Sequence, residues 1–183
     1  MLRKILFSTE RAHIMDVTIS DVPDLLAHWH AVPPILECLA WAEDDACDVV
    51  REMLGDQHTA QRQAYRMIVR DKADLAAMGY LSAYKFERNL CPDVGISLNP
   101  AYQGKGIGSE LYRSVIAFTF NKFSDPFVKA TVDPSNKASL RMHLKCGFQP
   151  FCFTKDGYVD GDHVEDDLSM RITRNHFKKH GAY

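Results

Sequence analysis

The sequence predicts a mixed α/β fold, of the α+β kind, built around one central sheet. Strand-like and helix-like runs alternate through the second half of the chain, and two adjacent strand-like runs in the first half supply antiparallel neighbours. The chain has 183 residues, of which 46% are hydrophobic, so it is long enough to bury a sizeable core. No shift in composition divides it, and we expect a single domain over residues 1–183.

The elements expected in the first half rest on caps, breakers and apolar alternation. Pro23 opens a helix that Ser20 or Asp21 caps, and Gly55 follows a second helix that has acidic residues in its first turn. A polar stretch over residues 71–74 separates two strands. In order, we expect a strand over 12–17, helices over about 21–30 and 43–54, and strands over 65–69, 78–86 and 94–98.

The second half carries two strongly patterned helices. The first repeats apolar residues in two rows, so much of its circumference should be buried against a sheet. The second begins at Asp133 or Ser135 and ends at Gly147. In order, we expect a helix over 111–123, a strand over 127–132, a helix to residue 146, and strands over 148–153 and 164–172 joined by an acidic hairpin loop.

A glycine-rich run lies between the strand over 94–98 and the helix that follows it. Gly104, Gly106 and Gly108 permit backbone conformations and close approaches that a Cβ would forbid, so successive N–H groups can converge on a phosphate at the positive end of a helix. The spacing is neither Gly-x-x-x-x-Gly-Lys-Ser/Thr nor Gly-x-Gly-x-x-Gly, so a Walker loop and a dinucleotide loop are both disfavoured.

Three segments of the chain resemble one enzyme family. The run Gln103-Gly104-Lys105-Gly106-Ile107-Gly108 resembles the Gln/Arg-x-x-Gly-x-Gly/Ala pyrophosphate loop of the GNAT acyl-CoA N-acyltransferases. Asn136, Ser139 and the pair Gly147-Phe148 resemble the Asn-x-x-Ser and Gly-Phe that end the same core. Thr9-Glu10-Arg11 is similar to the opening of the branch of ribosomal-protein-type N-terminal acetyltransferases, which also includes enzymes for polyamines and antibiotics.

The resemblance implies a fold and a cosubstrate. The implied fold has a single central mixed sheet, antiparallel with a splayed parallel pair and flanked by helices, and the pantetheine arm of acetyl-CoA lies in the splay. Gly95 lies in the first strand of this pair, where it either marks a local bulge or relieves packing against neighbouring residues. The residues implied to bind acetyl-CoA are Ile96 and Leu98 through their backbone, Gln103, Gly104, Lys105, Gly106, Ile107 and Gly108 of the loop, and Asn136.

Two side chains are candidates for the acid that protonates the leaving thiolate. Asn136, Ser139 and His143 are spaced i, i+3 and i+7, which places them on one helix face. Ser139 matches a position where some relatives carry a proposed serine donor, whereas His143 stands where many relatives have a tyrosine. Either residue can instead be a packing residue, so the acid stays open. No general base is identified; Glu87 is a candidate, with a solvated strand end as the alternative.

The acceptor is the least constrained part of the prediction. The resemblance implies an amine acceptor, with a protein N-terminal α-amine first and a polyamine or aminoglycoside second. A non-catalytic acyl-CoA-binding module and a toxin acting on charged tRNA are rival interpretations. The acidic residues of the final hairpin either attract a cationic amine or form a solvated loop tip, and Trp29 and Trp41 either line an acceptor wall or belong to the core.

The composition disfavours several classes of binding partner and of cellular location. A net charge of −2 supplies no basic field, so nucleic acid is an unlikely partner, and no run reaches transmembrane length. The five cysteines form no Cys-x-x-Cys pair, and the apolar start is too short for a signal peptide, which favours the cytoplasm. His28 and His30 point to opposite sides of a helix, so we expect no metal site. A homodimer is left open.

Overall fold

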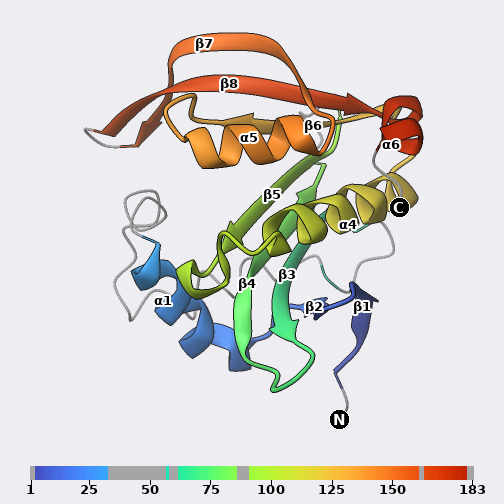
Figure 1. The fold of residues 1–183 in the computed structure, drawn as a ribbon, viewed down its shortest axis with the longest axis vertical. Coiled ribbons are helices and arrows are strands. Elements are labelled where there is room, and N and C mark those ends of the chain that lie inside the picture. Colours follow the sequence, from blue (N-terminus) through green and yellow to red (C-terminus); the bar gives the residue numbers. More distant parts are fainter. Residues whose placement is uncertain (1–2, 33–56, 58–61, 86–90, 161–162, 181–183) are drawn as a thin grey trace.

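The computed structural model describes residues 3–32, 57, 62–85, 91–160 and 163–180, and Figure 1 shows their arrangement. These residues form one eight-stranded sheet in the order β1-β2-β3-β4-β5-β6-β8-β7. The strands are β1 (Ile5–Ser8), β2 (Ala12–Asp16), β3 (Ala64–Asp71), β4 (Ala77–Tyr84), β5 (Asp93–Leu98), β6 (Phe127–Val132), β7 (Gln149–Asp160) and β8 (His163–Thr173). The helices are α1 (Val22–Ala31), α4 (Ile107–Lys122), α5 (Lys137–Lys145) and α6 (Arg174–His180), with short 3-10 helices η1 (Ile19–Asp21) and η2 (Pro100–Tyr102). The predicted mixed α/β fold is confirmed.

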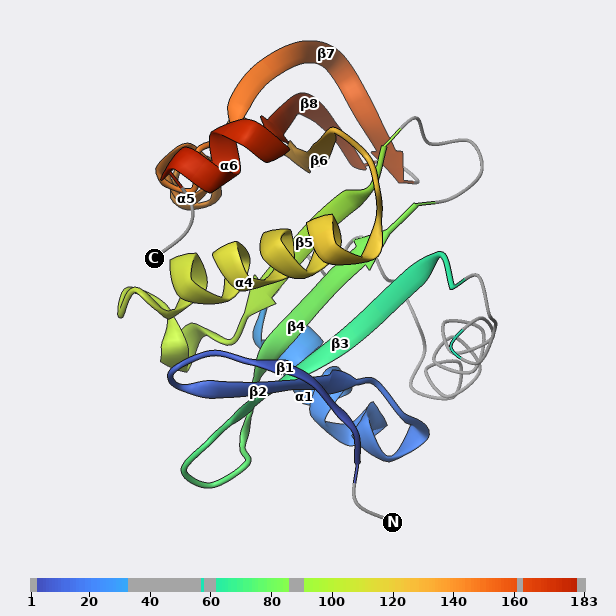
Figure 2. The same ribbon diagram turned by 90° about the vertical axis from the view of Figure 1, so that its right-hand side faces the viewer.

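Helices cover both faces of the middle of the sheet. Met67 and Val69 of β3 pack in the cluster that contains the buried residues of α4, while Ile68 packs with the buried residues of α1. Because successive side chains of a strand point to opposite faces, α4 and α1 lie on opposite sides of the sheet. Figure 2 shows α4 on one side of β3 to β5 and α1 on the other.

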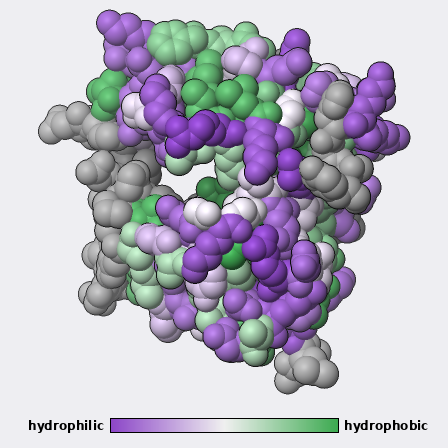
Figure 3. All heavy atoms as spheres, in the orientation of Figure 1, coloured by the Kyte–Doolittle hydropathy of each residue, from purple (hydrophilic) through white to green (hydrophobic). Residues whose placement is uncertain are grey.

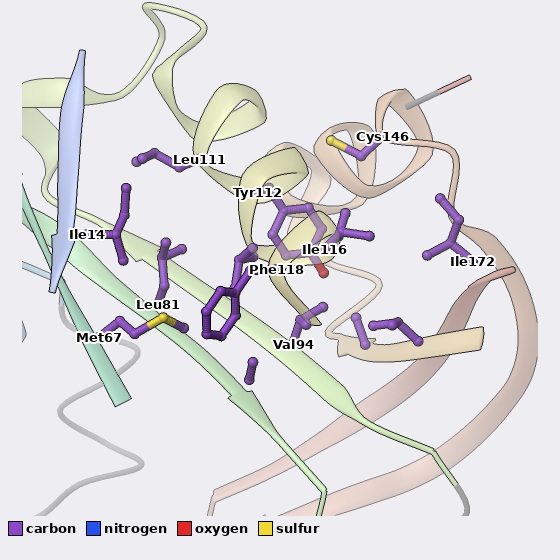
Figure 4. Close-up of a cluster of buried hydrophobic side chains, with 14 of the residues drawn as sticks. Ile14, Met67, Leu81, Val94, Leu111, Tyr112, Ile116, Phe118, Cys146 and Ile172 are labelled. Carbon is purple, nitrogen blue, oxygen red and sulfur yellow. The ribbon is translucent and has the colours of Figure 1, made fainter. Parts of the chain in front are cut away.

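The larger core lies between the sheet and α4. Both apolar rows predicted for this helix are buried, as Leu111, Val115 and Ile116 are completely inaccessible. Figure 4 shows strand residues such as Leu81 and Val94 directed toward this helix. Burying a side chain of this size contributes about 1.5–3 kcal/mol, so α4 is held firmly against the strands that border the site.

Two elements were not predicted, and one prediction was wrong. The strand β1 has only four residues, and α6 is a polar seven-residue helix in which Phe177 is the buried hydrophobic side chain, so neither has a periodicity long enough to recognise. The acidic hairpin loop is much shorter than expected, because β7 and β8 continue to Asp160 and His163. Two register shifts in their pairing hide the alternation that would have identified the longer strands.

A buried carboxylate joins the start of α1 to the sheet. Asp21 accepts hydrogen bonds from Arg3 at 2.7 and 2.6 Å and from Arg70 at 2.6 Å, and the Thr18 backbone N–H donates to it at 2.8 Å. Burial raises the pKa of Asp21, but these hydrogen bonds outweigh burial and leave the pKa below its usual value. Asp21 therefore anchors the helix that carries residues toward β5, rather than capping it with its side chain.

Candidate active site

The sheet opens between β5 and β6. These strands run parallel and pair at a single register position, Asp93 with Lys129, whereas β5 pairs with β4 over six positions. The Lys129 N–H donates to Pro92 C=O at 2.9 Å, and the strands diverge beyond that point. The predicted splayed parallel pair is therefore present, and Figure 3 shows the molecule hollowed between the half that carries β6 to β8 and the half that carries α1.

The backbone of β5 turns polar groups into this opening. Asn99 N–H donates to Met78 C=O of β4, while Pro92 C=O faces β6. Polar groups alternate sides along a strand, so Ile96 and Leu98 direct their N–H and C=O groups toward the β6 side, the side that the Pro92 C=O also faces. Gln103 holds the C-terminal end of β5, because its Nε2 donates to Leu98 C=O at 2.8 Å.

The glycine-rich run forms a loop that leads directly into α4. Gly104 and Gly106 have φ values of +73° and +78°, and a Cβ built at either would have no atom within 4 Å. The backbone conformation is therefore what requires glycine here. Gly106 is the N-cap residue, and the first helical bond runs from Glu110 N–H to Gly106 C=O, so the N–H groups of residues 107–109 have no acceptor within the helix.

The N-terminal Thr9-Glu10-Arg11 segment clamps this loop. Arg11 donates to Lys105 C=O at 3.2 Å and binds the carboxylate of Glu110 at 2.5 and 2.7 Å. Burial raises the pKa of Glu110, but hydrogen bonds from Thr9 and Arg11 outweigh burial and lower the pKa overall. Arg11 thus offsets an acidic charge in the first turn of α4, where a bound anion would otherwise be repelled. The Lys105 ammonium donates to Ala101 C=O.

The start of α5 brings Asn136 and Ser139 together. Asn136 is the N-cap residue, and its Oδ1 accepts from Ser139 N–H at 3.0 Å. The helix therefore begins later than predicted, since Asp133 and Ser135 form a separate turn in which the Asp133 carboxylate accepts from Ser135 N–H. Ser139 is half-buried, which leaves its hydroxyl within reach of a ligand.

His143, the second predicted acid, is buried. Its side chain is 4% exposed, its Nδ1 lies 2.8 Å from Ser139 C=O, and its Nε2 lies 2.8 Å from the Tyr112 hydroxyl. A carbonyl only accepts, so Nδ1 carries the proton and Tyr112 donates to Nε2. Burial lowers the pKa of His143 more than the Ser139 carbonyl raises it, so the imidazole is neutral at pH 7. The Ser139 hydroxyl lies 3.4 Å from Nδ1.

The structure decides between the two explanations for Gly95. The pairing of β4 with β5 runs through Ser82 and Gly95 without a register shift, so the expected bulge is absent from this described pair. A Cβ on Gly95 would lie 2.7 Å from Ser82 Oγ. Gly95 therefore relieves packing between the two strands.

The structure gives little information on the role of several other predicted residues. Glu87, Trp41 and the expected helix over 43–54 lie outside the described residues. Trp29 is buried in the α1 cluster. The described part of the chain holds no group of three His, Cys, Asp or Glu side chains suited to a metal ion, and none of its helices has the length and apolar character to cross a membrane.

Two side-chain contacts at the site have no recognisable pattern in the sequence. Tyr112 belongs to an apolar row of α4, and its hydroxyl finds His143 only because α4 and α5 pack together. His28 of α1 contacts Ser97 of β5 at 2.7 Å across 69 residues of sequence. Neither pair has a characteristic spacing, so only the tertiary structure could identify them.

A mixed sheet that opens beside a glycine-rich helix start is the arrangement implied by the resemblance to the acyl-CoA N-acyltransferases. Residues 11–149 match the family model described as "Acetyltransferase (GNAT) domain", and the chain belongs to that family. The predicted family is thereby confirmed.

Known proteins share this fold and sequence pattern. The uncharacterized N-acetyltransferase YnaD of Bacillus subtilis (strain 168) is 28% identical over 132 residues, covering 72% of this chain and 74% of the relative. The ribosomal-protein-S5-alanine acetyltransferase of Vibrio fischeri has a TM-score of 0.76 at 19% identity, covering 92% and 96% of the two chains. The spermidine N-acetyltransferase of Vibrio cholerae, solved with CoA and spermine, has a TM-score of 0.74 at 15% identity, covering 91% and 98%. These structural likenesses concern the fold.

Proposed function

We propose that this protein transfers an acetyl group from acetyl-CoA to a primary amine, first of all a protein N-terminal α-amine, in a direct ternary complex. The observation that carries the proposal is the opening between β5 and β6, into which Ile96 and Leu98 direct backbone polar groups beside the glycine-rich loop. A cosubstrate with a peptide-like arm and a pyrophosphate fits both features. The solved spermidine N-acetyltransferase complex contains CoA.

The cosubstrate would occupy the two features in order. The pyrophosphate would accept hydrogen bonds from the backbone N–H groups of the run from Gln103 to Gly108, at the positive end of α4, with Lys105 adding charge. The pantetheine amides would continue the ladder of β5 through Ile96 and Leu98, as an added strand does. Asn136 and Ser139 lie at the start of α5, which follows β6 on the other side of the opening.

Ser139 is the better placed of the two candidate acids. When the amine attacks the thioester carbonyl, the C–S bond breaks and the sulfur needs a proton. Ser139 is half-buried, and among the described residues its hydroxyl makes the long 3.4 Å contact to His143, whereas both ring nitrogens of His143 are engaged. We therefore assign proton donation to Ser139 and assign His143 to positioning, by holding the Ser139 carbonyl and the first turn of α5.

A small cationic amine is the second candidate acceptor. The observation that favours it is a group of acidic side chains carried by β7 and β8 of the hairpin, namely Asp156, Glu165, Asp166 and Asp167. Burial raises the pKa of Asp167, and the neighbouring Glu165 raises it further. A polyamine would relieve this like-charge crowding.

Thiol release from acetyl-CoA tests the proposal against a panel of amino-terminal peptides, polyamines and aminoglycosides, with a no-acceptor control. Turnover on peptides supports the leading acceptor, and turnover confined to polyamines or aminoglycosides supports the second. Ser139→Ala should lower kcat by about 10²-fold or more with unchanged acetyl-CoA affinity. Ser20→Ala, which removes an exposed hydroxyl bonded to Thr18, is the matched control. Acetyl-CoA binding without turnover on any amine would refute the catalytic role in favour of a binding module.

A further inference from the structure

A histidine on α1 lies against the strand that borders the opening. His28 is 4% exposed, and its Nε2 lies 2.7 Å from the Ser97 hydroxyl. Its Nδ1 is buried and has no hydrogen-bond partner among the described residues. A buried polar atom without a partner costs about 1–3 kcal/mol, so packing within the described part of the chain gives no reason for a histidine here.

Ser97 lies where the acceptor would arrive. It sits between Ile96 and Leu98, whose side chains pack with the α4 cluster, so the Ser97 side chain points to the opposite face. That face is the one covered by α1. The helices α4 and α5 cover the other face, because Leu140 and Met142 of α5 pack in the same cluster. An acceptor that enters from the Ser97 side of the opening would meet the Ser97 hydroxyl, and Ser97 is half-buried rather than enclosed.

We propose that Ser97 and His28 form the proton-accepting pair for the acceptor amine, with Ser97 contacting the amine and His28 acting through it. This inference rests on the proposed acetyltransferase function and supplies the general base that the sequence analysis left unidentified. An α-amine with a pKa of about 8 is mostly protonated at neutral pH, so it must lose a proton before it attacks.

The step balances as a proton relay. The substrate ammonium gives a proton to Ser97 Oγ while the Ser97 hydroxyl proton passes to His28 Nε2. The free lone pair attacks the thioester carbonyl carbon, a C–N bond forms, and the C–S bond breaks. The sulfur takes a proton from the Ser139 hydroxyl. The second amine proton then leaves the nitrogen and reprotonates Ser139. One net proton remains on His28 and returns through Ser97 to solvent after product release.

Burial and the neutral or paired groups around His28 keep its imidazole unprotonated before the amine arrives. Burial lowers the pKa of His28, so the imidazole is neutral at pH 7. Tyr80 lies opposite Ser97 in the β4–β5 register, and burial raises its pKa, so it stays neutral as well. Arg66 interacts with Tyr80, and Asp24, one turn before His28, binds Arg70 at 2.6 Å. The nearest carboxylate of α1 is thus occupied by an arginine.

The experiment compares His28→Gln, Ser97→Ala and Ser97→Thr with the wild type, using an amino-terminal peptide that the wild type acetylates. His28→Gln and Ser97→Ala should lower kcat by about 10²-fold, leave the KM and the calorimetric Kd for acetyl-CoA unchanged, and lose the acid limb of the kcat–pH profile. Ser97→Thr keeps the hydroxyl and should recover most of the rate. The chain offers a control pair of the same residue types, because His13 on β2 and Ser8 on β1 form a serine–histidine contact at 2.9 Å on the surface, through His13 Nδ1. His13→Gln and Ser8→Ala should leave every parameter unchanged.

Each other result overturns the inference. If His28→Gln keeps the wild-type kcat and pH profile, the pair has no part in proton transfer, while the acetyltransferase proposal stands. If Ser97→Thr is as slow as Ser97→Ala, with cooperative unfolding retained by both, the hydroxyl is not the relay. If the wild type itself acetylates no amine although acetyl-CoA binds, the proposed function fails, and this inference fails with it.

Discussion

Replacing Gly106 by alanine isolates the conformational requirement of the glycine-rich loop. Gly106 has a φ of +78°, in the left-handed region, yet a Cβ built there meets no atom within 4 Å. The substitution therefore adds strain and no clash. For an L-residue this conformation costs about 1–2 kcal/mol, so we expect Gly106→Ala to lower the free energy of unfolding by that amount.

The same helix start contains the matched control. Gly108 has no left-handed φ, and a Cβ there would make ordinary contacts, 3.6 Å to Met142 Sδ and 3.8 Å to Leu98 Cδ2. Alanine is favoured over glycine inside a helix by about 1 kcal/mol. Gly108→Ala should therefore be neutral or stabilising, and the two variants should differ by about 2–3 kcal/mol although each adds one methyl group.

Urea unfolding and calorimetry check this expectation together. A difference of ~2 kcal/mol corresponds to about 4–8 °C in Tm for a chain of this size. Acetyl-CoA should bind Gly106→Ala more weakly than the wild type, because relaxation of the strained residue redirects the N–H groups that begin α4. Equal stability of the two alanine variants would refute the reasoning, since the left-handed conformation would then carry no cost.

Three further outcomes are expected. Asp21→Asn should destabilise the protein by about 1.5–3 kcal/mol at pH 7 in urea unfolding, because it removes the buried charged acceptor of Arg3 and Arg70, although Arg70 keeps Asp24 as a partner. The folded-state pKa of Asp21 is depressed, so its stabilisation is present above the unfolded pKa and is lost as pH falls through the folded pKa; the gap to the variant should shrink toward about pH 3. Tyr112→Phe should cost about 1–3 kcal/mol by thermal unfolding, since it removes the donor to the buried Nε2 of His143, and an unchanged Tm would contradict that bond. Arg11→Ala should change the unfolding free energy by no more than about 1 kcal/mol, because its ion pair with Glu110 is partly exposed, yet it should weaken acetyl-CoA binding in calorimetry about fivefold; unchanged affinity would show that the clamp does not order the loop.

Local patterns account for what the sequence predicted well. The helix α4 has two apolar rows over more than four turns, and its glycine-rich start has a distinctive spacing, so both were identifiable without tertiary contacts. The strands β3 to β6 also followed from alternation and breakers. These features depend on interactions within about one element, which is the range over which sequence periodicity is informative.

Long-range pairings account for what the sequence missed. His143 fell on the predicted helix face, but its burial follows from the packing of α5 against Tyr112, 31 residues earlier. His28 was considered for metal binding with its neighbour His30, whereas its described partner is Ser97 on a distant strand. Whether a histidine acts as an acid, a base or a packing residue depends on which ring nitrogen is hydrogen-bonded and on its partner. Sequence periodicity does not contain that information.

The register of β5 joins the two halves of the proposed chemistry. The polar backbone groups of Ile96 and Leu98 face the opening, and the side chain of Ser97 between them faces α1, so a slip of one residue would exchange the two sets. Gly79 on β4 protects this register, because a Cβ there would lie 2.3 Å from Ser97 C=O. The close approach of β4 to β5 at that point therefore depends on the glycine at position 79. The proposed cosubstrate recognition and the proposed proton transfer would thus both depend on one strand pair, and a change in its register would disable both at once.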